Sequence, residues 1–222
     1  MSSHVSYSWR GLILFAAGIL WIASSLIHPS DFDPFALFNP FWIPTAILIA
    51  LAYLLIPFGL IGIQRTLIDQ KSKLTRIGFI FTIIGSLSSV LTSLAFGFVA
   101  PHVARQLTTP TALFDLIKPD GQLMWAGLLL STYILLFLPG CILVGRAVIV
   151  ESVLPQSAGW LLTIGVVMFS LGRIVPQLFI LTSIGGVVFG IAWSWLGYAL
   201  CLSKAKVVHS SKSKDYPQIK TS

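Results

Sequence analysis

The sequence is poor in charged residues. Only 9% of its 222 residues are Asp, Glu, Lys or Arg, whereas a soluble domain carries about 25%. So few charges cannot cover a water-facing surface, and the mean hydropathy of +0.91 agrees with this. The composition therefore excludes a soluble globular protein and indicates a chain that folds in a lipid bilayer.

Cysteine is also scarce. The chain has two cysteines, Cys141 and Cys201, and neither belongs to a metal-binding spacing such as CxxC. Both are expected near the cytoplasmic ends of membrane spans, where thiols stay reduced. We therefore interpret them as packing residues and predict no disulfide.

The sequence lacks the common catalytic and nucleotide-binding motifs. It contains no glycine-rich phosphate loop, HExxH or GxSxG, and no expected span contains the aspartate that an intramembrane aspartyl protease needs. The four histidines fall at expected helix ends or in the tails, which argues against a pair of haem ligands inside the bundle. We predict neither a cofactor nor a metal, and we lean against enzymatic activity.

Long uncharged apolar runs dominate the rest of the chain. About 20 residues cross the hydrocarbon as a helix, and continuous apolar runs favour helices over barrel strands, which alternate. We therefore predict an all-α polytopic membrane protein with one domain, residues 1–203, and a basic flexible cytoplasmic tail, residues 204–222. The predicted spans are residues 9–28, 42–63, 77–100, 123–146, 158–175 and 177–202.

The basic residues predict the orientation of these spans. If the N-terminus is cytoplasmic, eleven Lys and Arg residues lie inside, and only Arg105, Lys118 and Arg173 lie outside. This asymmetry predicts that both termini are cytoplasmic, and it supports the short fifth span. The net charge of +7 is explained by these flanks, so nucleic-acid binding is not predicted. The tail is expected to contact anionic lipid headgroups.

The first apolar run has an alternative interpretation as a cleavable signal peptide. Arg10 precedes it, and the small residues Ala23 and Ser25 suit a cleavage site. The apolar stretch nevertheless continues through Leu26 and Ile27. We therefore predict that the run is retained as the first span.

Two polar connections predict short helices at the outer surface. In "SSLIHPSDFDPFALFNPFW", residues 24–42, Asp33 suits a cap and Pro34 suits a first helical position. The same pattern recurs in "TTPTALFDLIKPDG", where Thr109 suits the cap and Pro110 the first position. The first segment is predicted to form a turn at the membrane interface, and the second a short amphipathic helix at the outer interface.

Small residues recur at every fourth position in the third and sixth spans. Such stripes let helix backbones approach closely, and we predict that they form seams inside the bundle, with a homodimer face as the alternative. They comprise Gly85, Ser89, Ser93 and Gly97, and Thr182, Gly186, Gly190 and Ser194.

Arg173 is the most informative polar residue. It lies about 21 Å along a helix that starts near Gly159, which places a charge below the outer surface of the membrane. Charged residues at such depth tend to face a bundle interior or a cavity. The alternatives are an arginine that extends to the headgroups and a structural ion pair with an outer aspartate, and together we favour these over a ligand site.

The candidate ligand-binding residues gather around this arginine on the predicted outer side. They are Arg173, Gln177, His28, Asp31, Asp33 and His102. Two histidines with nearby carboxylates also suit a divalent metal, but their spacing matches no ligand motif, so no metal site is predicted.

Several motifs resemble those of small bacterial multi-pass membrane proteins for which no activity is established. The carrying segments are His28-Pro29, "FGLIGIQR", "FGFVAPHVA", "GRAVIVESVLPQSAGWLLTIG" and "GIAWSWLGYAL". Such proteins often have a histidine early in the second span, where this chain reads "WIPTAIL". The resemblance implies a location in the bacterial cytoplasmic membrane and implies no activity.

Two functions from different classes follow. We favour a non-enzymatic accessory component of the cytoplasmic membrane, with lipids, a second copy or another membrane protein as partners. The alternative is a small transporter or lipophilic-ligand binder with a site near Arg173. A ligand site predicts that Arg173, His28 and the outer aspartates converge on a cavity, and a structural role predicts that Arg173 is paired or faces headgroups.

Overall fold

The computed structural model describes residues 8–66, 73–107, 109 and 112–213, and all regular structure among these residues is helical. The longer α-helices are α1 (Ser8–Ile27), α2 (Trp42–Thr66), α3 (Lys73–Leu94), α6 (Met124–Thr132), α7 (Leu138–Glu151), α8 (Gln156–Ile174) and α9 (Ile180–Ser213). The short elements are η1 (Ala36–Phe38), η2 (Ala95–Val99), α4 (Ala100–Ala104), α5 (Leu113–Ile117), η3 (Tyr133–Phe137) and η4 (Pro176–Leu178). Of these, η1 and η4 are 3-10 turns, and η2 and η3 are π-helical.

Six helical segments in the described part of the chain are long and apolar enough to cross a membrane. The predicted all-α fold with six spans is therefore confirmed, and it indicates a multi-pass membrane protein. The segments are Trp9–Ile27, Trp42–Gln64, Lys73–Ala104, Met124–Glu151, Gln156–Ile174 and Ile180–Leu202. Which side of the membrane the termini occupy stays a prediction.

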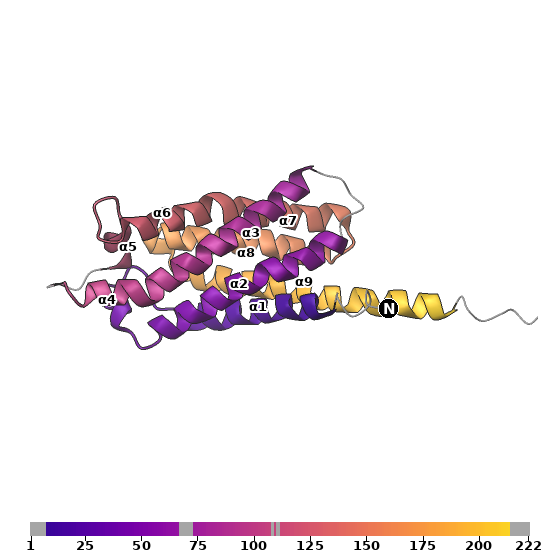
Figure 1. The fold of residues 1–222 in the computed structure, drawn as a ribbon, viewed down its shortest axis with the longest axis horizontal. Helices are drawn as coiled ribbons and strands as arrows, with labels where there is room; N and C mark the ends of the chain where they lie inside the picture. Colours follow the sequence, from indigo (N-terminus) through magenta and orange to yellow (C-terminus); the bar gives the residue numbers. More distant parts are fainter. Residues whose placement is uncertain (1–7, 67–72, 108, 110–111, 214–222) are drawn as a thin grey trace, which may run out of the picture.

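The spans form a closed ring in which neighbours in sequence are neighbours in space. α1 packs against α2, α2 against α3, α3 against α6 and α7, α7 against α8, and α8 against α9, while α9 returns to α1. Figure 1 shows the long helices running side by side along one axis. We call the end that carries η1, α4 and α5 the cavity end, and α1 begins and α9 ends at the opposite end.

The last helix is longer than the sequence predicts. α9 continues to Ser213, through the first part of the predicted tail, because neither Gly nor Pro occurs from Tyr198 to Ser213 to end it. The remaining tail, residues 214–222, lies outside the described residues.

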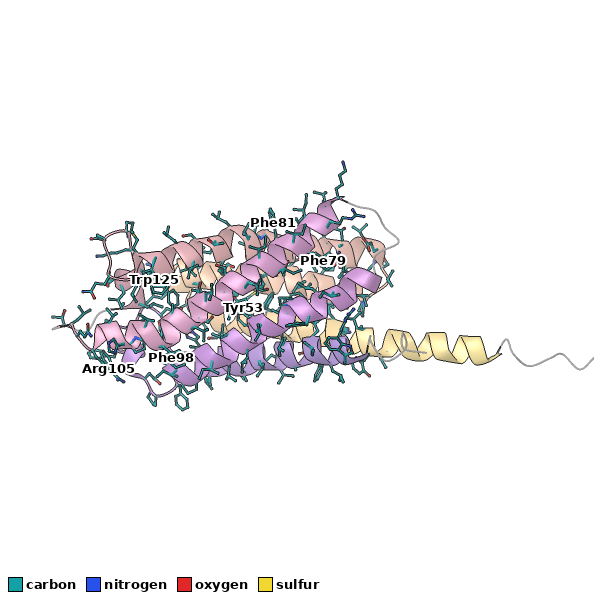
Figure 2. The ribbon with its side chains drawn as sticks, viewed as in Figure 1. Tyr53, Phe79, Phe81, Phe98, Arg105 and Trp125 are labelled. Carbon is teal, nitrogen blue, oxygen red and sulfur yellow. The ribbon has the colours of Figure 1, made fainter. Side chains whose placement is uncertain are left out.

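Aromatic side chains fill the centre of the ring. Trp21 of α1 makes edge-to-face contacts with Tyr53 of α2, Phe169 of α8 and Phe189 of α9, with ring centroids 5.1, 4.9 and 5.2 Å apart. Tyr53 also meets Tyr133 of η3 at 5.9 Å, and Figure 2 shows Tyr53 at mid-length of the bundle. Such pairs stabilise a core by about 0.5–1.5 kcal/mol each beyond burial, so this cluster holds five of the six spans together.

The small-residue stripes face other helices of the same chain, as predicted. A Cβ on Gly85 would meet the backbone and Cβ of Phe137, and a Cβ on Gly186 would meet the Ser25 side chain. A Cβ on Gly190 would meet Ile22 of α1. These stripes are therefore seams inside the bundle, and a homodimer stays a prediction.

The short helices at the cavity end differ in detail from those predicted. Asp33 accepts a hydrogen bond from Phe35 N at 2.9 Å, but the turn that follows is 3-10 rather than α-helical and its N-cap residue is Phe35, so the prediction of Asp33 as the cap is wrong. In the second segment α5 begins after Ala112, so the prediction of Thr109 as its cap is wrong. Pro110 lies outside the described residues. The buried residues of α5, Leu113, Leu116 and Ile117, confirm an amphipathic helix.

Candidate functional site

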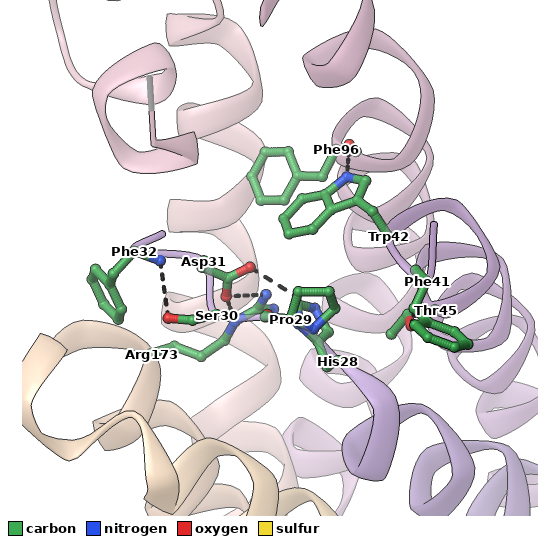
Figure 3. A network of polar contacts seen from close by, with 10 residues as sticks. All are labelled: His28, Pro29, Ser30, Asp31, Phe32, Phe41, Trp42, Thr45, Phe96 and Arg173. Atoms are coloured by element: carbon green, nitrogen blue, oxygen red, sulfur yellow. Dashed lines mark hydrogen bonds and ion pairs between the residues drawn. The ribbon is translucent and has the colours of Figure 1, made fainter. Parts of the chain in front are cut away.

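A buried ion pair joins the first connection of the chain to the fifth span. α1 ends at Ile27, because the His28-Pro29 sequence disfavours further helix, and the turn that follows directs Asp31 into the bundle. Arg173, in the last turn of α8, donates to Asp31 Oδ2 from Nε at 2.9 Å and from Nη2 at 2.5 Å. The exposed fractions of the two side chains are 1% for Asp31 and 17% for Arg173. Figure 3 shows this pair together with His28 and Trp42.

The pair leaves one carboxylate oxygen without a hydrogen bond. The Nε and Nη2 groups of Arg173 both donate to Asp31 Oδ2, whereas Oδ1 is buried and has no hydrogen-bond partner in the protein. The guanidinium also lies 5.4 Å from the centroid of the Phe169 ring, which suits a cation–π contact. The arginine is therefore well held, while Asp31 can still accept a hydrogen bond.

His28 presents a second acceptor to the same place. Its Nδ1 lies 2.5 Å from the Pro29 carbonyl oxygen, and because a carbonyl only accepts, Nδ1 must carry the hydrogen. Its Nε2 lies 3.8 Å from Asp31 Oδ1. Burial lowers the pKa of His28 below its ordinary value, Arg173 lowers it further, and Asp31 and the Pro29 carbonyl oppose this shift. In the neutral ring Nε2 is an acceptor facing Asp31.

The lowered pKa of His28 predicts that acid destabilises the fold. Below about pH 6.5 the unfolded chain protonates this histidine, whereas the folded chain keeps it neutral until lower pH, so folding stability falls as the pH decreases through that window. We expect the melting temperature of the wild type to fall more between pH 7 and pH 5.5 than that of His28→Asn. The asparagine amide keeps a donor for the Pro29 carbonyl. Parallel pH profiles of the two proteins would contradict this assignment.

Two neighbouring cavities meet at the ion pair. The smaller, of about 30 Å³, is lined by polar side chains including His28, Asp31 and Tyr53, and we call it the polar cavity. The larger, of about 150 Å³, is lined mainly by apolar side chains, and we call it the apolar cavity. Five residues line both cavities: Asp31, Phe96, Leu130, Tyr133 and Arg173. The polar cavity has room for about one water molecule, and the apolar one has the size that admits a benzene-sized molecule.

Two further buried hydroxyl groups at these cavities form no well-oriented hydrogen bond in the protein, although the hydroxyl of Tyr133 lies near those of Tyr53 and Ser170. They belong to Tyr133, which lines both cavities, and Ser170, which lines the apolar one. Leaving a buried polar group unpaired costs about 1–3 kcal/mol. The buried groups whose hydrogen-bonding capacity the protein does not use are therefore concentrated around the two adjoining cavities.

Both π-helical segments border this place. η2 supplies Phe96 and η3 supplies Tyr133 and Ile134 to the cavity walls. The Trp42 indole N–H donates to the Phe96 carbonyl oxygen at 2.8 Å (Figure 3), which holds α2 against η2. Single π turns inside α-helices occur often at functional sites, because the wider turn changes which side chains face inward.

The structure brings together three of the six predicted site residues. Arg173, Asp31 and His28 line the polar cavity. Asp33 is exposed and accepts a hydrogen bond from Phe35 N, Gln177 is exposed in η4, and the exposed His102 lies 3.2 Å from the Gln106 amide nitrogen. None of these three lines either cavity. Among the described residues no three His, Cys, Asp or Glu side chains gather closely enough to hold a metal ion.

Several residues that line the two cavities could not be identified from the sequence. Phe96, Leu130 and Ser170 look like ordinary residues of apolar spans, and no local signal distinguishes them. Tyr133 carries a weak signal, because it is one of few polar side chains expected inside a span. A comparison with models of protein families, with curated proteins and with solved structures found no match for this chain.

Proposed function

We propose that this multi-pass membrane protein binds a small, mainly apolar molecule inside its helix bundle at the cavity end. The observation that carries the proposal is the apolar cavity of about 150 Å³, whose wall includes the buried Arg173–Asp31 pair. The side chains of Leu113, Leu130 and Ile134 supply an apolar wall, and the ion pair supplies a polar end. Apolar walls with a few convergent polar groups are typical of small-molecule sites.

A purely structural role explains the ion pair but not its surroundings. If Arg173 served only to join α8 to the first connection, close packing around the ion pair would be expected. About 150 Å³ is left unfilled by side chains, and unfilled volume inside a protein costs folding free energy. A ligand that fills this volume would offset that cost, which supports binding over packing alone.

The same geometry also bears on the accessory role, which the sequence favours. An accessory component would bind its partner through an outer surface, whereas the unused hydrogen-bonding groups of Asp31, Tyr133 and Ser170 face inward. Binding inside the bundle uses these groups directly. We therefore place the function at the interior site and leave the accessory role as a prediction.

The proposal is tested by filling the cavities from one side chain. Leu130 lines both cavities, so Leu130→Phe should occupy ligand volume. We expect native mass spectrometry of the wild type, purified in mild detergent, to show a bound small molecule that is absent from Leu130→Phe. Leu128→Phe is the matched control, because Leu128 lies on the same helix and is 63% exposed. Identical bound species in all three proteins would overturn the proposal.

A further inference from the structure

The groups where the two cavities meet can accept more hydrogen bonds than the protein donates to them. Arg173 directs two of its five N–H donors to Asp31 Oδ2, and Oδ1 has no hydrogen-bond partner in the protein. His28 donates Nδ1–H to the Pro29 carbonyl, and in the neutral ring its Nε2 faces Asp31 Oδ1 as an acceptor at 3.8 Å. Two acceptors that face each other repel unless a hydrogen is donated between or beside them. The missing partner is a donor.

The charge of the site points to a neutral partner. Arg173 and Asp31 neutralise each other in a buried pair. A ligand with a net charge would add an uncompensated charge inside the bundle, where desolvation is unfavourable. A carboxylate would in addition oppose the free oxygen of Asp31, and an ammonium group would oppose Arg173.

On the basis of the proposed function, we infer that the ligand is a neutral amphiphile with a hydroxyl head, an alcohol or a phenol. Its hydroxyl donates to Asp31 Oδ1, and its apolar body occupies the apolar cavity beside Leu130 and Ile134. Tyr133 lines both cavities and its hydroxyl forms no well-oriented hydrogen bond in the protein, so it can donate to the hydroxyl oxygen of the ligand. A hydroxyl both donates and accepts, which suits this mixture of groups.

A water molecule alone would satisfy only part of the site. The polar cavity can hold about one water, which could donate to Asp31 Oδ1. It would leave the apolar cavity, with its Ser170 hydroxyl, without an occupant. A preference for a hydroxyl over a methyl head group therefore distinguishes a site that binds a hydroxyl ligand from an ion pair that binds only water.

We would measure this selectivity with fluorinated probes of one shape. 4-Fluorophenol and 4-fluorotoluene differ by a hydroxyl in place of a methyl group, and ¹⁹F NMR reports their binding to the detergent-purified protein. The signal measured with Leu130→Phe gives the background that arises when the probes partition into detergent micelles. We expect the phenol to bind the wild type about tenfold more tightly than the toluene after this correction, since one hydrogen bond to a charged group supplies at least that factor.

The variant Asp31→Leu/Arg173→Met tests the assignment to the ion pair. Apolar replacement of both partners of a buried pair is usually tolerated, so this protein should fold, and its affinity for 4-fluorophenol should no longer exceed its affinity for 4-fluorotoluene. Equal binding of the two probes to the wild type would overturn the hydroxyl head and leave the proposed function standing. Tighter binding of 4-fluorobenzoate or 4-fluorobenzylammonium would overturn the neutral head. Failure of every probe to bind above the Leu130→Phe background would overturn both proposals.

Discussion

Replacing Arg173 with methionine is expected to destabilise the folded protein by about 3–5 kcal/mol, the usual loss when one partner of a buried ion pair is removed. The physical reason is that Asp31, only 1% exposed, would keep a charge inside the bundle with neither of its two hydrogen bonds from Arg173. The expected result is a large decrease in melting temperature. It is measurable by a thiol-reactive dye, because Cys141 is fully buried and becomes reactive on unfolding.

The control for this prediction removes both charges together. Asp31→Leu/Arg173→Met leaves no unpaired charge, so its free energy of unfolding should lie much closer to that of the wild type than that of Arg173→Met. The double-mutant cycle then gives the coupling between the two side chains. A double variant that is destabilised by the sum of the two single effects would show that the pair is not coupled in the folded protein.

Replacing Gly18 with alanine is expected to have the second largest effect, a loss of about 2–3 kcal/mol. A Cβ at this position would lie 2.5 Å from Ser194 N and would also meet the Gly190 carbonyl oxygen. Both are backbone atoms of α9, so the contact cannot be relieved by a side-chain rotation, and α1 and α9 must separate. Overpacking of this kind typically costs 1–3 kcal/mol, although alanine alone would favour a helix over glycine by about 1 kcal/mol.

Gly62→Ala is the matched control for the α1–α9 seam. Its nearest neighbours would be Arg10 Cβ at 3.2 Å and Leu200 Cδ1 at 3.4 Å, so small movements relieve both contacts. Its melting temperature should therefore change much less than that of Gly18→Ala in the same assay. Equal losses in the two variants would show that the close approach of α1 and α9 does not limit stability.

The place of the unused hydrogen-bonding groups is the reason why we propose an interior site rather than an accessory role. The sequence favours an accessory component because it shows few polar groups inside the spans. The structure gathers Asp31, Tyr133 and Ser170 around adjoining cavities, although they come from the first connection, η3 and α8. A small number of polar groups can define a site when they converge.

The sequence by itself determined the six spans and the all-helical fold. The length and apolarity of a run are local properties, and in a bilayer each backbone polar group must be satisfied within its own helix. The unusual depth of Arg173 follows from the same local count, since its distance from the start of the fifth span is fixed by helical rise. The interior seams were also readable, because a small residue at every fourth position marks one helix face.

Only the tertiary structure decided which residues meet Arg173. Asp31 and Asp33 are two residues apart and are equally suitable as carboxylates, but the turn after α1 buries Asp31 and leaves Asp33 exposed at the start of η1. His28 faces the pair, whereas His102 and Gln177 remain exposed. The cavities depend on side chains from several separate elements, among them Phe96, Leu113, Leu130 and Ile174. Such a volume is a property of packing between elements distant in sequence, so no local pattern in the chain can specify it.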